Sequence, residues 1–139
     1  MWALLPPEVT RLLGHHHANG AFTGQPASAG RPADAWVELS AELDTYRHLA
    51  DDYDGQGAVA PTSEIVDGAI ELLGDCRRLG LVPPSCVVAG VNGTVSLEWD
   101  LPNRQCVTIE VTGRHTAEVF LIALDQHSAS WVLGPALTA

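Results

Sequence analysis

The 139-residue sequence contains no lysine. Its seven basic residues are all arginine and stand against 17 acidic residues, which gives a net charge of −10. This charge repels nucleic acids and anionic membrane surfaces, so we expect neither as a direct partner. A basic protein is the partner that the charge favours.

Long apolar runs and cysteine pairs are also missing. No stretch approaches the ~20 apolar residues that a membrane helix needs, and the first residues lack the early basic charge and apolar run of a secretory signal. The sequence therefore predicts a cytoplasmic protein. Cys76, Cys86 and Cys106 form no CxxC pair, and we interpret them as reduced thiols rather than metal ligands or a disulfide.

The length favours one domain with a substantial core. Residues 1–13 form a short apolar docking segment, in which "PPEVTRLLG" predicts a two-turn helix that stops at Gly14. Residues 14–33 are rich in Gly, Ala, Ser and Pro and predict a flexible linker. His15–His17 lie within it, where a mobile loop would not preorganise them for a metal. Residues 34–139 are predicted to form a single α+β domain.

Two amphipathic helices are expected at the start of that domain. Apolar residues recur at three- and four-residue steps from Trp36 to Ala50, as on one face of a helix. The second helix, "SEIVDGAIELLGDCRRLG", is expected to begin at a cap formed by Thr62 or Ser63 and to end at Gly80.

The apolar period then changes from 3.6 to 2 residues, which indicates β-strands. "TVSLEWD" and "QCVTIEVT" alternate cleanly, and pairing Trp99 with Val107 sets apolar residues opposite one another along both strands. Asn92-Gly93 predicts a two-residue type I′ turn before the first of them. With "EVFLIALD" after the second, we predict an antiparallel meander of about four strands, one face of which packs on the two helices.

The other face of this sheet is expected to carry apolar residues too. If Val119 faces the helices, Phe120 and Ile122 face outward. An apolar outer face needs a cover. The candidates are the segment 1–13, the C-terminal "SASWVLGPAL" or another subunit, and the segment could be exchanged between two subunits. The segment residues that we expect to be buried there are Trp2, Leu4, Leu5 and Leu12.

The charge is distributed unevenly along the chain. Residues 34–75 contain eleven acidic residues and a single base, Arg47. The acids recur at helical spacing, which destabilises a helix by a few tenths of a kcal/mol per like-charged pair. A solvated face explains this pattern, and so does a docking surface for a basic protein. The predicted docking residues are Asp34, Glu38 and Glu42 on the first helix, Glu64, Asp67, Glu71 and Asp75 on the second, and Phe120 and Ile122 on the sheet.

A further group of carboxylates lies in the loop "LADDYDGQGAVAPTSEI", where Asp51, Asp52 and Asp54 surround Tyr53. The spacing of an EF-hand fails at both ends of this loop, so calcium is not expected. We interpret the loop as a connector in which Tyr53 anchors in the core and the carboxylates accept backbone hydrogen bonds. No metal and no cofactor are expected.

Three functions are compatible with these patterns. The one we favour is a non-catalytic protein that binds another, basic protein, as an antitoxin, an immunity protein or an inhibitor does. The second is a hydrolase-like enzyme that uses His48 with Asp51, Asp52 and Asp54, since a histidine oriented by a carboxylate can act as a general base. No nucleophile motif or phosphate-binding loop accompanies these residues. The third is a small-molecule binding module with its pocket between helices and sheet.

The stretch "YDGQGAVAPTSEIVDGAIELL", followed by "VNGTVSLEWD" and "CVTIEV", resembles a group of small uncharacterised bacterial proteins. That group carries a Trp-Asp-Gly-x-Gly-Ala…Pro motif, a helix, and a strand that follows a glycine turn and ends in Leu-Glu-Trp. The similarity covers roughly residues 50–112, and this chain has Tyr53 where the group usually has Trp. The resemblance implies the α+β architecture and no particular activity.

Overall fold

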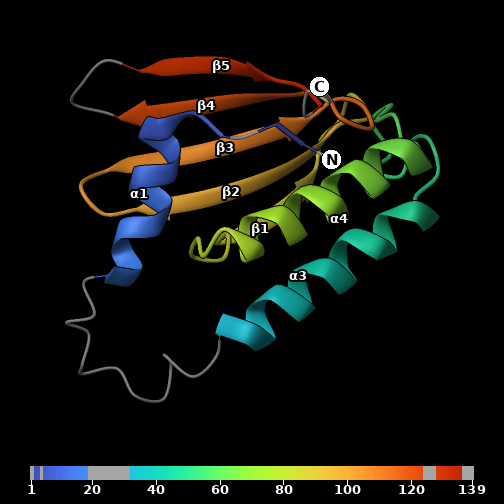
Figure 1. The fold of residues 1–139 in the computed structure, drawn as a ribbon. Coiled ribbons are helices and arrows are strands. Elements are labelled where there is room, and N and C mark those ends of the chain that lie inside the picture. Colours follow the sequence, from blue (N-terminus) through green and yellow to red (C-terminus); the bar gives the residue numbers. More distant parts are fainter. Residues whose placement is uncertain (1, 4, 19–31, 124–127, 136–139) are drawn as a thin grey trace.

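The computed structural model describes residues 2–3, 5–18, 32–123 and 128–135, without the side chains of residues 15–18 and 32–34. These residues form three α-helices, one 3-10 turn and a five-stranded antiparallel sheet. Figure 1 shows the strands as one layer, with the helices gathered on one side of it. The predicted α+β fold is confirmed, with five strands rather than about four.

The helices are α1 (Pro7–Ala18), α3 (Pro32–Thr45) and α4 (Ser63–Arg78), and the 3-10 turn η2 (Tyr46–His48) directly follows α3. Both ends of α4 match the prediction. Thr62 caps it, because its Oγ1 accepts a hydrogen bond from the backbone nitrogen of Ile65 at 3.3 Å. Gly80, with a φ of 78°, follows its last turn.

Helix α1 continues past Gly14, where the sequence predicted that it would stop. Gly14 does not have the positive φ that ends many helices. Next to it, Leu13 is fully buried, and its carbonyl oxygen accepts a hydrogen bond from the backbone nitrogen of Val82 at 3.0 Å. Tertiary packing therefore overrides the weak local stop signal. Of the predicted linker, residues 14–18 and 32–33 are helical, and residues 19–31 lie outside the described residues.

The sheet is a meander in the order β1-β2-β3-β4-β5, and every neighbouring pair is antiparallel. Trp99 lies opposite Val107, and the flanking apolar pairs follow in the same register, as the alternation predicted. The strands are β1 (Cys86–Ala89), β2 (Val95–Leu101), β3 (Gln105–Val111), β4 (Ala117–Ala123) and β5 (Ala129–Leu133).

Strand β5 comes from the C-terminal stretch that was a candidate cover for the outer face. Its side chains alternate, with Trp131 half-buried against the core and Ser130 and Val132 exposed. A strand with this period pairs along the edge of β4 and extends the sheet. It therefore does not cover the outer face.

The connection between β1 and β2 is not the predicted two-residue type I′ turn. The backbone nitrogen of Gly90 donates to the carbonyl oxygen of Thr94 at 2.8 Å, which encloses three residues. Gly93 has a φ of 82°, whereas Asn92 has no positive φ. A left-handed third residue is common in three-residue hairpin loops. Asn92 instead forms an isolated β-bridge with Val59. Val59 belongs to the loop 49–65 that carries Asp51, Asp52 and Asp54, which we call the acidic loop, so this bridge connects the loop to the hairpin.

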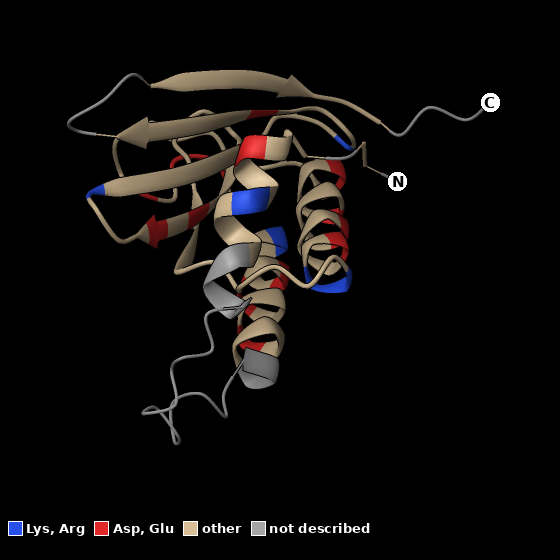
Figure 2. Cartoon of the chain, turned by 60° about the vertical axis from the view of Figure 1, so that its left-hand side comes forward, with Lys and Arg blue, Asp and Glu red and all other residues tan. Residues whose placement is uncertain are grey.

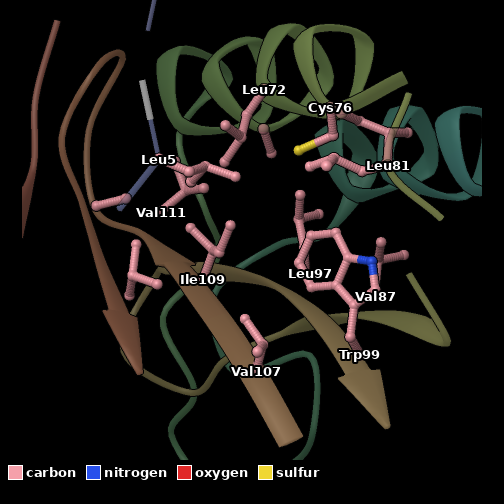
Figure 3. Close-up of a cluster of buried hydrophobic side chains, with 14 of the residues drawn as sticks. Leu5, Leu72, Cys76, Leu81, Val87, Leu97, Trp99, Val107, Ile109 and Val111 are labelled. Carbon is pink, nitrogen blue, oxygen red and sulfur yellow. The ribbon is translucent and has the colours of Figure 1, made fainter. Parts of the chain in front are cut away.

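The core lies between the sheet and the three helices. Figure 3 shows the part of it between α4 and the strands. Trp2, Leu5 and Val9 belong to the same buried cluster as the inward residues of β2 and β3. The prediction that the N-terminal segment covers the outer face near Phe120 and Ile122 is therefore wrong. Figure 1 shows α1 over β3 and β4, beside α4, which is where α3 and α4 leave the inner face open.

The segment is fixed at its beginning as well. The backbone nitrogen of Ala3 donates to the carbonyl oxygen of Gly134 at 2.9 Å, just beyond β5. Leu12 is partly buried, and Leu4 lies outside the described residues.

Among the helices that the structure describes, none has the length and the apolar surface needed to cross a membrane.

Candidate binding surfaces

The three aspartates of the acidic loop point at the backbone of the loop itself. Asp54 Oδ1 accepts hydrogen bonds from the backbone nitrogens of Gln56 at 2.8 Å and Ala58 at 3.1 Å. These bonds lower the pKa of Asp54, because they stabilise its charged form. Asp52 and Asp51 accept similar bonds from the amides of Gly57 (2.7 Å) and Ala60 (3.0 Å). The loop is built as the connector that the sequence predicted.

Tyr53 is half-buried and lies at the edge of the sheet. The prediction that it anchors in the core between helices and sheet is therefore wrong. Its hydroxyl oxygen lies 3.1 Å from the carbonyl oxygen of Gly90 and 3.4 Å from that of Ala89. The hydroxyl of Tyr46 lies 3.2 Å from the carbonyl oxygen of Val87. These two tyrosines therefore cap edge strand β1, whose free carbonyls would otherwise invite pairing with another chain.

The residues of the hydrolase hypothesis do not converge. His48 is exposed in η2, and in the described part of the chain no hydrogen bond joins its ring to Asp51, Asp52 or Asp54. The carboxylates are already occupied by loop amides. No group of three or more potential metal ligands is close enough to hold an ion within residues 2–3, 5–18, 32–123 and 128–135.

Two of the predicted docking acids on α4 form ion pairs with nearby arginines of the same chain. Asp67 Oδ1 lies 2.6 Å from Arg47 Nη2, just after α3. Asp75 pairs with Arg78 one turn further along α4. Glu64, in the first turn of this helix, is exposed and has no ion pair among the described residues. The charge that α4 offers to a partner is thus smaller than the sequence suggested.

Glu71, the remaining acid of that row, contacts the turn between β3 and β4. Its Oε1 lies 2.7 Å from Arg114 Nη1, and its Oε2 lies 3.1 Å from His115 Nε2. The ring of His115 packs edge-on against the indole of Trp2, with centroids 5.5 Å apart. Glu71 therefore holds the sheet, the helix and the N-terminal segment together.

The acids of α3 border a different part of the molecule. Glu38 and Glu42 are exposed, and the side chain of Asp34 lies outside the described residues. Glu42 Oε2 lies 2.9 Å from the hydroxyl of Tyr46, whose pKa is raised first by burial and then by this carboxylate. Glu42 thus lies toward β1, whereas Glu71 lies toward the turn between β3 and β4. Figure 2 shows the acidic residues along both helices and in the strands.

The outer face of the sheet carries further carboxylates, at Glu98, Asp100, Glu110 and Glu118. No ion pair involves any of them among the side chains that the structure describes. Glu110 lies directly opposite Glu118 in the register of β3 and β4. Like charges in this position destabilise a sheet. Among the described residues, the side chain of Glu110 has one hydrogen-bond partner, the hydroxyl of Thr94, which lies 2.9 Å from its Oε2.

Cys86, at the start of β1, lies between the acids of α3 and those of the outer face. Its Sγ is 3.6 Å from Glu98 Oε1. Partial burial and then the nearby charges of Glu98, Asp100 and Glu42 raise the pKa of this thiol. One negative region therefore continues from α3 around β1 to the outer face. We call it the acidic β1 surface and define it as Glu38, Glu42, Glu98 and Asp100.

Apolar side chains adjoin these acids on the outer face. Ile122 is 42% exposed and Phe120 is half-buried, and both point away from the helices, as predicted. Val132 on β5 is 84% exposed and Val88 on β1 is 39% exposed. No described element covers this face. It combines apolar patches with unpaired carboxylates, the composition of a surface that can bind a partner.

A groove of about 670 Å³ lies in the helix layer, between α3 and α4. Trp36 and Leu73 contribute apolar walls. Arg47 lies at the end where α3 finishes and α4 begins, and Arg77 lies in the last turn of α4. The alternative of a small-molecule module assumed a pocket between helices and sheet, where the core lies. A smaller groove of about 200 Å³ lies beside Cys76, the pKa of which burial raises to about 12.

The comparisons with known proteins give no relative: no protein-family model, no curated protein and no solved structure matches this chain. The resemblance to small bacterial proteins stays a prediction from the motif. Sequence reasoning missed Glu98 and Asp100 as docking residues, although the alternation of their strand already placed both outward. It also missed the groove, for which the only signal was Gly74 in the middle of α4.

Proposed function

We propose that this chain is a non-catalytic module that binds a basic protein through the acidic β1 surface and the neighbouring outer face of the sheet. The proposal keeps Glu38, Glu42, Phe120 and Ile122 as binding residues and adds Glu98 and Asp100. A module that neutralises a basic partner, as an antitoxin, an immunity protein or an inhibitor does, fits this surface best.

The observation that carries the proposal is the contrast between the two sets of acids. Asp67, Glu71 and Asp75 are each held by a cation of the same chain. The acids of the β1 surface have no such partner in the described residues, so their charge is directed to solvent. Unpaired charge of one sign beside exposed apolar side chains supports binding of an oppositely charged protein, whose association it accelerates.

Opposing carboxylates support the same proposal. The pair Glu110 and Glu118 costs stability in the free protein and would be relieved by a lysine or arginine from a partner. The same repulsion disfavours a second copy of this chain on the outer face. The four carboxylates of one copy would then face the same four carboxylates of the other copy. Local arrangements that oppose stability often mark functional sites.

The test is affinity capture from a lysate of the native host, with step elution by salt. We expect the wild-type chain to retain proteins rich in Lys and Arg that elute as salt rises, because exposed charges are screened within about 8 Å at physiological ionic strength. The variant Glu98→Arg with Asp100→Arg should lose these proteins.

A matched control reverses two exposed acids elsewhere, Glu8→Arg with Glu64→Arg, and changes the net charge by the same amount. The control should retain the same proteins nearly as well. If both double variants lose them equally, net charge alone explains the binding. If neither loses them, the acidic β1 surface is not the binding site.

A further inference from the structure

The groove between α3 and α4 has the dimensions of a ligand site. Its volume of about 670 Å³ falls within the roughly 300–1,000 Å³ typical of small-molecule pockets. Trp36 and Leu73 are nearly fully buried at its base, and Ile70 is partly exposed to it. Its floor is therefore apolar, and the polar groups lie toward its ends.

Gly74 lines this groove from the middle of α4, where glycine costs about 1 kcal/mol relative to alanine. Packing does not require it: a Cβ at this position would meet only the flexible end of Arg78, at 3.6 Å. Gly68 on the same helix is different, because a Cβ there would overlap the carbonyl oxygen of Arg114. Because Gly74 has no side chain, the groove stays open at this position.

The two arginines of the groove differ in their partners. Arg47 is held by Asp44 at 2.7 Å and by Asp67 at 2.6 Å, so two carboxylates already occupy this cation at its end of the groove. Arg77 forms no ion pair in the described part of the chain. Of the two cations that line the groove, Arg77 is therefore the unpaired one.

From these observations we propose that the groove binds a small molecule with an apolar body and a single carboxylate, such as a medium-chain fatty acid. The apolar body lies over Trp36, Leu73 and the open position at Gly74. The carboxylate pairs with the guanidinium of Arg77, which can donate two parallel hydrogen bonds to it. This site is separate from the acidic β1 surface.

Geometry limits the length of the ligand. Arg77 lies ten residues after Asp67 on α4, which is about 15 Å at a rise of 1.5 Å per residue. Asp67 pairs with Arg47, and this ion pair lies at the opposite end of the groove from Arg77. An extended chain of about ten carbons fits between Arg77 and this pair, so decanoate is a suitable probe.

The experiment is isothermal titration of the full chain with decanoate, decanol and decyltrimethylammonium, each below its micelle concentration. We expect saturable binding of one decanoate per chain, weaker binding of decanol, and the weakest binding of the cation. Absence of saturable decanoate binding, or equal binding of decanoate and the cation, would overturn the proposal.

Three variants locate the site. Gly74→Leu fills the groove and favours the helix, so it should fold at least as stably as the wild type and bind decanoate at least tenfold more weakly. Arg77→Gln should weaken decanoate at least tenfold and leave decanol unchanged. Arg78→Gln, one residue further and paired with Asp75, is the control and should bind decanoate as the wild type does. Unchanged binding by Gly74→Leu would place the ligand elsewhere and refute the assignment.

Discussion

The indole nitrogen of Trp2 donates a hydrogen bond to the carbonyl oxygen of Gly68, 2.9 Å away and 66 positions along the chain. At Gly68 three elements meet, because α4 also lies directly against the backbone of the turn between β3 and β4. The N-terminal segment is thus a structural part of the domain. The carbonyl of Gly68 receives this segment, and the missing side chain of Gly68 lets the turn between β3 and β4 approach α4.

Gly68→Ala is expected to destabilise the protein by about 1–3 kcal/mol, the usual cost of overpacking. The added Cβ would overlap the carbonyl oxygen of Arg114 and lie 2.9 Å from that of Gly113, and backbone cannot move aside as a side chain can. Urea unfolding measures the change. Gly74→Ala on the same helix is the control and should stabilise the protein by up to about 1 kcal/mol. Equal effects of the two substitutions would contradict this account.

Trp2→Phe is expected to lower the free energy of unfolding by about 1–3 kcal/mol, because it removes the indole donor to the carbonyl of Gly68 and leaves a smaller ring in the core. Deletion of residues 1–13 should destabilise the domain far more, since Leu5, Val9 and Leu13 belong to its core. Thermal melting of both proteins distinguishes this from docking of the segment on the outer face, where its deletion would leave the core intact. An unchanged melting temperature after deletion would refute the docking.

Local sequence patterns predicted the register of β2 and β3 because one face of the sheet is buried, so a slip by one residue would bury polar side chains. They also predicted the cap and end of α4. The docking side of residues 1–13 was not predictable from pattern, since an apolar segment fits either face of a sheet. What decided it was the inner face left open over β3 and β4.

The docking acids illustrate a second limit. The sequence row from Glu64 to Asp75 looked like one negative surface, but Glu71 is paired with Arg114 and His115, more than 40 residues away. Sequence spacing reports the charge of a helix face and not the cations that folding brings to it. Conversely, the sequence pattern shows Glu98 and Asp100 only as outward residues of a strand. In the fold, both lie near Cys86, and so does Glu42 of α3.

The tyrosine caps of β1 predict a change in association as well as in stability. Tyr46→Phe and Tyr53→Phe should each cost about 1 kcal/mol, the usual net contribution of one hydrogen bond. Tyr53→Ala should cost less than the 3–5 kcal/mol of a fully buried aromatic, because Tyr53 is half-exposed. The double phenylalanine variant frees carbonyls of an edge strand. Size-exclusion chromatography should show more self-association by this variant as its concentration rises, and an unaltered monomer fraction would argue against the capping role.

The last prediction concerns acid and the loop around Tyr53. Backbone hydrogen bonds hold the pKa of Asp54 below its ordinary value in the folded protein, so the charged carboxylate stabilises the fold. That contribution is complete above the ordinary aspartate pKa of about 3.9 and is lost as the pH falls through the lower folded value. Asp54→Ala should therefore melt below the wild type at pH 7, and the difference should shrink progressively as the pH drops below about 4. Melting curves of both proteins between pH 7 and pH 3 measure it. A difference that stays constant down to pH 3 would mean that the charge of Asp54 does not support the loop.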